Sequence, residues 1–119
     1  MKISRCKNYS PGKGKDYNNS KVAWGWESVE VQWEENEIVD LTTKCGISCN
    51  EFSDGHKVKD SWIGTSAIML DFDDGMMTAD QLLSKQSNWS FNSYVFSSQN
   101  HQKEKGSEPA CDRLRVLIP

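Results

Sequence analysis

A short apolar run that ends abruptly in carboxylates is the most constraining feature of this sequence. Residues 67–75 read AIMLDFDDG, so a stretch of strand length is followed at once by three aspartates and a glycine. A near-continuous apolar run of this length is typical of a central strand that is covered on both faces. Asp71 and Asp73 alternate across Phe72, so both carboxylates project from one face if the strand geometry persists.

The repulsion between these two carboxylates suggests that the pair binds a cation. Carboxylates held this close raise one another's pKa unless a cation neutralises them. Oxygen ligands suit Mg²⁺ or Mn²⁺, and with nucleotide phosphates in the coordination shell such a pair is the usual metal platform of phosphoryl and nucleotidyl transfer. Asp74 is either a further ligand or a cap of the Asp-Gly turn. The plainer alternative is an acidic turn that binds no metal, because Asp and Gly are favoured turn residues.

Length and composition predict one small domain over residues 1–119. The chain is 36% hydrophobic and 10% aromatic, which is enough to build a core. Its net charge of −3 argues against an all-over basic coat for nucleic acid but allows a local basic face. There is no apolar run of roughly 18 residues and no signal-peptide core, so we expect a cytoplasmic protein with no membrane partner.

The four cysteines are expected to be reduced, buried thiols in that compartment. Cys45 and Cys49 have a spacing that some zinc sites use, and His56 follows them. Because no second pair accompanies them, a small zinc-stabilised binding domain is the weakest of the alternatives.

The apolar periodicity and the turn signals predict an α/β (α+β) fold with a mixed β-sheet and helices packed on it. Thr78 to Gln81 fit a capping box, and Gly46 is the expected stop of the first helix. The chain ends directly after an apolar strand, which suggests a domain that is cut short. The expected elements are a flexible or exposed segment 1–21, a strand within 22–33, a short helix within 34–46, a strand 65–72, a helix from 79 to about 86, and strands 91–98 and 113–118.

Two later segments place polar side chains where they can meet the acidic pair. The strand ending at Ser97 and Ser98 is followed by His101, an imidazole that can donate to a phosphate oxygen. Arg113 and Arg115 alternate to one face and suit bidentate binding of a triphosphate. A solvent-exposed histidine and solvated arginines are the ordinary alternatives. The convergence of three elements on adjacent strands favours a nucleotide site.

The series LDFDDG, TADQ, YVFSSQNH and DRLRVLIP resembles the catalytic core of the archaeo-eukaryotic primase superfamily, especially the primase-polymerases of plasmids, phages and mobile elements. The resemblance covers roughly residues 45–119. It implies a metal-binding pair, a histidine that contacts the incoming nucleotide, a neighbouring hydroxyl, an Arg-x-Arg strand and a basic stretch before the acidic strand. In this sequence these are Asp71 and Asp73, His101, Ser97 or Ser98 (Gln99 stands at the usual serine position), Arg113 and Arg115, and Lys57 and Lys59.

The resemblance implies template-directed primer synthesis from NTPs or dNTPs with Mg²⁺ or Mn²⁺, in the replication of a plasmid, phage or mobile element. Single-stranded DNA is the implied template, and whether a replicative helicase is a further partner stays open. The family's third acidic motif is not found within the 119 residues. This supports an alternative, a primase-like module that binds nucleotide, nucleic acid or a replication protein without catalysis, as a regulator or inhibitor.

Overall fold

The computed structural model describes residues 1–6, 24–98 and 100–119. Of the segment 1–21 that was expected to be flexible or exposed, residues 7–21 lie outside these ranges. The described chain forms two compact units, Met1–Ala67 and Ile68–Pro119, which we call unit 1 and unit 2 and describe separately. In the described residues, no helix is both long enough and apolar enough to cross a membrane.

The predicted combination of helices and strands is confirmed, but the predicted mixed sheet is wrong. The described strands form three small sheets, ordered β2-β1-β3, β4-β5 and β6-β8-β7, in which every pairing is antiparallel. Two α-helices accompany them, α2 (Glu35–Lys44) and α3 (Ala79–Gln86), together with one turn of 3₁₀ helix, η1 (Lys59–Ser61).

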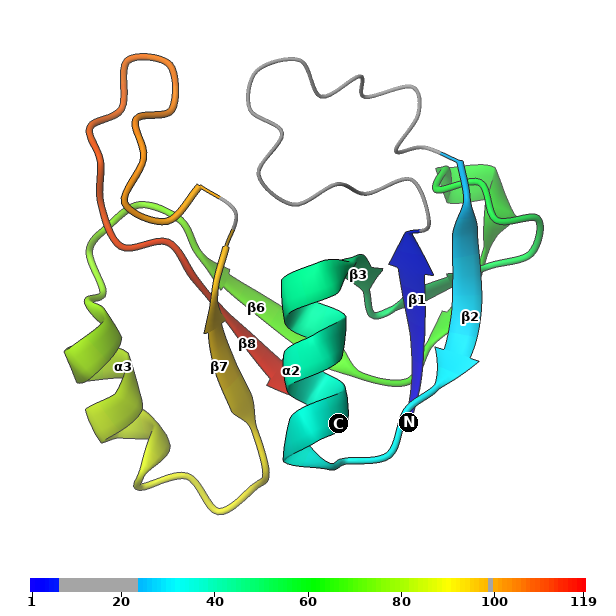
Figure 1. Cartoon of the computed structure of the whole chain (residues 1–119), viewed down its shortest axis with the longest axis horizontal. Helices are drawn as coiled ribbons and strands as arrows, with labels where there is room; N and C mark the ends of the chain where they lie inside the picture. The colour runs from blue at the N-terminus through cyan, green and yellow to red at the C-terminus, as the bar shows by residue number, and fades with distance from the viewer. Residues whose placement is uncertain (7–23, 99) are drawn as a thin grey trace. The chain divides into compact units, whose positions relative to one another are not determined.

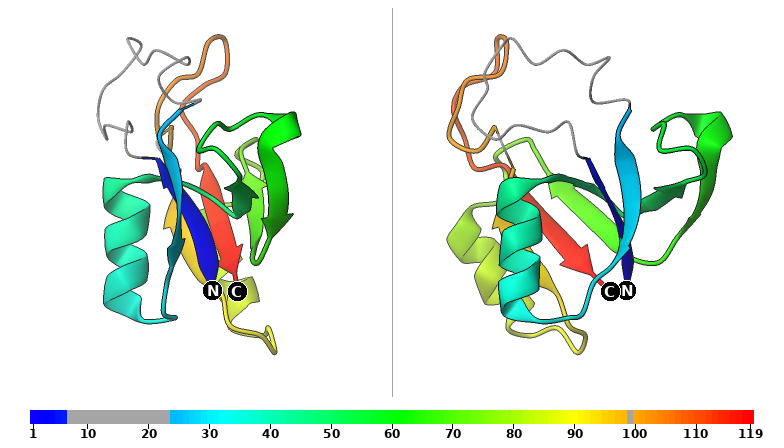
Figure 2. Two further views of the ribbon diagram at one scale, coloured as in Figure 1. Left: turned by 90° about the vertical axis from the view of Figure 1, so that its right-hand side faces the viewer. Right: turned by 45° about the vertical axis from the view of Figure 1, so that its right-hand side comes forward.

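Unit 1 is built on a strand that the sequence analysis assigned to the exposed N-terminal segment. Strand β1 (Lys2–Cys6) lies between β2 (Trp26–Glu30) and β3 (Gly46–Ser48). Ile3 and Ser4 are adjacent residues of β1 and so point to opposite faces of the sheet. Both are buried, so both faces of β1 are covered. Figure 2 shows α2 on one side of this sheet and the pair β4 (Asn50–Phe52) and β5 (Trp62–Thr65) on the other.

Helix α2 forms where the apolar spacing predicts it. Ile38 and Leu41 are buried on one face, as their spacing requires. The prediction that Gly46 stops the helix is wrong. The helix ends at Lys44, its C-cap Cys45 is extended, and Gly46 is already the first residue of β3.

Unit 2 places β8 (Leu114–Ile118) between β6 (Ile68–Phe72) and β7 (Tyr94–Ser97), as Figure 1 shows. The prediction that the run before Asp71 is the central strand is therefore wrong: β6 is an edge strand among the described strands, and Ile68 is 57% exposed. The central strand is β8, in which Val116 and Leu117 are fully buried. The two apolar runs look similar in the sequence. Among the described strands, it is β8 that pairs with a strand on each side.

Helix α3 confirms the predicted capping box and the predicted end at Gln86. The hydroxyl of Thr78 accepts from the Gln81 amide, and the Gln81 side chain accepts from the Thr78 amide. Leu82 is buried against Leu114 and Val116 of β8. This contact fixes the start of α3 beside the end of β6, where the acidic residues lie.

Candidate functional site at one end of the unit 2 sheet

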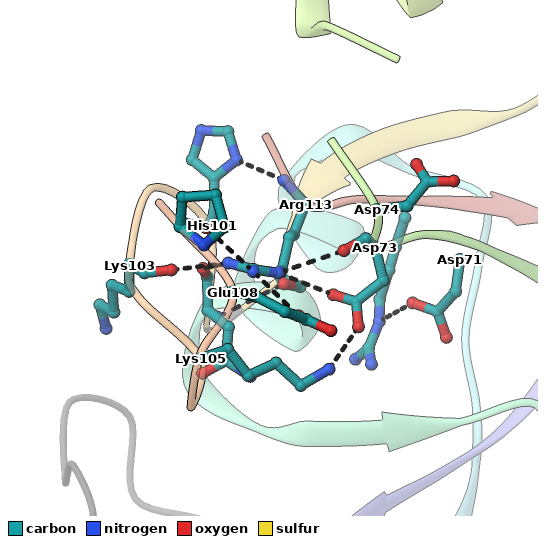
Figure 3. Close-up of polar contacts among 12 residues, drawn as sticks. Asp71, Asp73, Asp74, His101, Lys103, Lys105, Glu108 and Arg113 are labelled. Carbon is teal, nitrogen blue, oxygen red and sulfur yellow. Dashed lines mark hydrogen bonds and ion pairs between the residues drawn. The ribbon is translucent and has the colours of Figure 1, made fainter. Parts of the chain in front are cut away.

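One end of the unit 2 sheet gathers the predicted polar side chains. Strands β6 and β7 are both antiparallel to β8, so their carboxyl ends meet at the edge where β8 begins. Figure 3 shows carboxylates from the end of β6, the loop that follows β7, and Arg113 from the start of β8 lying together there. These are the elements that the sequence analysis expected to converge.

The Asp71 carboxylate is neutralised by an arginine of the neighbouring strand. Asp71 and Arg115 are direct partners in the β6–β8 ladder, so their side chains share a face. The Arg115 Nε donates to Asp71 Oδ1 at 2.6 Å. The two side chains are 56% and 37% exposed, so solvent reaches this pair.

Asp73 is held by two cations. Lys105 Nζ donates to its Oδ2 at 2.6 Å, and Arg113 Nε lies 3.3 Å from its Oδ1. The hydrogen bond from Lys105, followed by the positive charges around it, lowers the pKa of the Asp73 carboxyl below its usual value. The sequence analysis missed Lys105, because it lies in a polar loop far along the chain and only the fold brings it to Asp73.

Arg113 is a buried arginine that organises the loop between β7 and β8. Its side chain is 1% exposed, and its guanidinium also donates to the Asp73 carbonyl. The remaining acceptors belong to the loop: the carbonyls of Asn100, Lys103 and Pro109 and the Glu108 carboxylate. Asp73 and the loop acceptors together engage all three guanidinium nitrogens, so Arg113 would have to give up loop contacts to bind a phosphate.

His101 is positioned through a hydrogen bond to one of its ring nitrogens. Its Nδ1 accepts the backbone N–H of Arg113 at 3.1 Å, which places the proton of the neutral ring on Nε2. Nε2 lies 4.0 Å from Asp112 Oδ1. The other Asp112 oxygen accepts from Ala79 N, the first residue of α3, at 2.7 Å. Asp112 Oδ1 accepts from Gln102 Nε2, so Asp112 connects the loop beside His101 to the helix start, a role that no sequence pattern indicated.

Asp74 and Gly75 form the turn that leads from β6 into α3. Asp74 Oδ1 accepts from Met76 N at 3.0 Å, as in an Asx turn, which is the turn-capping alternative predicted for it. Gly75 has φ of 74°, a conformation that favours glycine.

The other predicted residues take different positions. Ser97 is exposed at the end of β7, whereas the Ser98 hydroxyl accepts from Asn100 N inside the loop. Lys57 and Lys59 belong to unit 1, on the segment that leads into β5.

The donor chemistry at the site fits a divalent cation in part. Asp71 and Asp73 offer the oxygen ligands that Mg²⁺ prefers, and both are about half exposed. A metal would have to compete with Arg115 and Lys105 for them. In the described part of the chain, no group of three or more His, Cys, Asp or Glu side chains is arranged to hold a metal ion, and this includes Cys45, Cys49 and His56. Burial raises the pKa of the Cys49 thiol to about 11, as expected for an inert buried cysteine.

The pairing of Lys105 with Asp73 predicts a pH response. Because the pKa of Asp73 is lowered in the folded state, the ion pair is present above the ordinary aspartate pKa of about 3.9 and disappears as the pH falls through the lowered value. In Lys105→Met, we expect the Asp73 carboxyl to titrate at higher pH, as followed by carbon-13 NMR. Asp112 is the internal control, because its pKa is lowered chiefly by the Ala79 amide and should not move. An unchanged Asp73 titration would contradict the ion pair.

Comparison with protein-family models, with curated proteins and with solved structures finds no match to this chain.

Proposed function

We propose that unit 2 carries the nucleotide site of a DNA primase-polymerase-type nucleotidyltransferase, acting in the cytoplasm in the replication of a plasmid, phage or mobile element. The observation that carries this proposal is the gathering of three contacts at one end of the β6-β8-β7 sheet: Arg115 binds Asp71, Arg113 lies against Asp73, and the Arg113 backbone binds His101. These side chains come from three separate segments of the chain, in the order in which the resembling family places its motifs.

Each of these residues has a role in the proposal. Asp71 and Asp73 hold Mg²⁺ or Mn²⁺, and the metal ion would neutralise the negative charge of the nucleotide phosphates. Arg115 is partly exposed and binds triphosphate oxygens once they compete with Asp71 for its guanidinium. His101 donates from Nε2, and Ser97 is the more accessible of the two serines for the hydroxyl role. Single-stranded DNA is the template, and Lys57 and Lys59 of unit 1 are contacts for phosphate.

A second candidate function is supported by the ion pairs themselves. Asp71 and Asp73 are both neutralised by side chains of the chain, and the described residues bring no third acidic ligand to them. A module that binds nucleotide, nucleic acid or a replication protein without catalysis fits these observations.

Titration calorimetry of Mn²⁺ and dATP tests the proposal. We expect the nucleotide to bind only with the metal present, and Asp71→Asn to lose this metal-dependent binding, because the amide keeps the shape of the side chain but loses the charge that attracts a cation. Asp80→Asn is the matched control, since Asp80 is an exposed aspartate of the same unit on α3. Metal-independent binding, or equal binding by Asp71→Asn, would refute the metal site.

Primer extension on single-stranded DNA separates the two candidates. Product formation by the wild type that is lost in Asp71→Asn supports the nucleotidyltransferase. Metal-dependent nucleotide binding without product supports the non-catalytic module. If neither binding nor product is found, the nucleotide site itself is wrong.

A further inference from the structure

Unit 1 carries an open hollow with aromatic and basic walls. Its volume is about 530 Å³, and the residues that line it are Asn50, Phe52, Lys57, Val58, Lys59 and Trp62. None of these lining residues is acidic, although the chain as a whole has a net charge of −3. The hollow is therefore a local basic surface on an acidic protein.

The aromatic wall is built by the β4–β5 pair. Phe52 and Trp62 are partners in the antiparallel register, so their side chains stand on the same face. Trp26 packs edge-on against Phe52, with ring centroids 6.0 Å apart. The indole of Trp62 is 54% exposed, an unusual position for so large an apolar surface.

Two lysines stand beside this wall. Lys57 Nζ lies 4.6 Å from the centroid of the Trp26 ring, a cation–π contact that fixes the position of its charge. Lys59 lies in η1 and makes no ion pair with another residue of the described ranges. Positive charge and an exposed aromatic face thus meet in one place.

We infer that this hollow binds single-stranded nucleic acid, with a base stacked on Trp62 and phosphates on Lys57 and Lys59. An exposed ring offers a face to any unpaired base, and lysines that accompany it attract the backbone without reading sequence. In a duplex the bases are already stacked on one another and present no face to the indole. The inference identifies a surface for the single-stranded partner of the proposed function and rests on that function for its biological meaning.

The test is fluorescence anisotropy of a labelled oligothymidine of about 12 nucleotides, without metal or nucleotide. We expect Trp62→Ala to weaken binding roughly ten-fold, because each stacked base contributes strongly to affinity, and Trp62→Phe to retain most of it. The Lys57→Ala/Lys59→Ala double variant should reduce the slope of log affinity against log salt by about 0.7 for each phosphate that the protein no longer neutralises.

The controls use neighbouring exposed residues. Ile63→Ala removes a side chain that is 63% exposed next to Trp62 but does not line the hollow, and Lys44→Ala removes a positive charge elsewhere in unit 1; neither should change binding. Circular dichroism verifies that each variant is folded. Full-strength binding by folded Trp62→Ala, or equal binding of a duplex, would overturn the inference. Asp71→Asn should still bind the oligonucleotide, so failure of the nucleotide site and failure of this surface are distinguished.

Discussion

Replacing Arg113 by alanine is expected to lower the free energy of unfolding of unit 2 by about 1.5–3 kcal/mol. The guanidinium is 1% exposed, and its removal leaves the Asp73 and loop carbonyls without their donor and the Glu108 carboxylate without its partner. These hydrogen bonds are part-buried, so water can replace only some of what the acceptors lose.

Hydrogen exchange measures this effect locally. The amides of His101, Gln102 and Lys103 bond within the loop, to Ser98 O, Cys111 O and Asn100 O, and they should exchange much faster in Arg113→Ala. Arg115→Ala is the matched control, because its ion pair with Asp71 is exposed and contributes about 1 kcal/mol at most. If the two variants unfold at the same urea concentration, Arg113 does not hold the loop.

Substituting alanine at Gly75 is expected to destabilise unit 2 by roughly 2–5 kcal/mol. A left-handed backbone costs a side chain about 1–2 kcal/mol, and crowding in a packed site adds about 1–3 kcal/mol. Both costs apply here, because φ is 74° and an added Cβ would lie 2.6 Å from the Cys111 Cβ.

Gly106 provides an unusually close comparison for Gly75. It also has a positive φ, of 64°, but an added Cβ would meet no atom within 4 Å. Gly106→Ala should therefore show the backbone cost alone, and the difference between the two variants in urea unfolding measures the crowding against Cys111. Equal destabilisation would mean that the turn after β6 relaxes away from Cys111.

Local signals in the sequence were reliable in this chain. The capping box at Thr78 and the buried face of α2 depend on residues a few positions apart, which the sequence shows directly. Strand β1 was missed because five residues with two charged side chains, KISRC, give too short a pattern to stand out from the loop that was expected there.

The site was predictable only in part, for a physical reason. Alternation indicated that Asp71 and Asp73 share a face, and that Arg113 and Arg115 do so. Whether these pairs would face a ligand or one another depends on the register between β6 and β8, which no local pattern contains. Lys105 and Asp112 were missed for the same reason, since their partners lie 32 and 33 residues away.

The contacts of Arg113 allow the loop between β7 and β8 to change in length without a change in the geometry of the sheet. Its acceptors lie on both arms of the loop, at Asn100 and Lys103 on one side and at Glu108 and Pro109 on the other. One side chain thus ties both arms together, while Gly106 at the tip has open space around it. Insertions and substitutions at this tip should cost little loop entropy and leave β7 and β8 in place. Sequence divergence should therefore concentrate there.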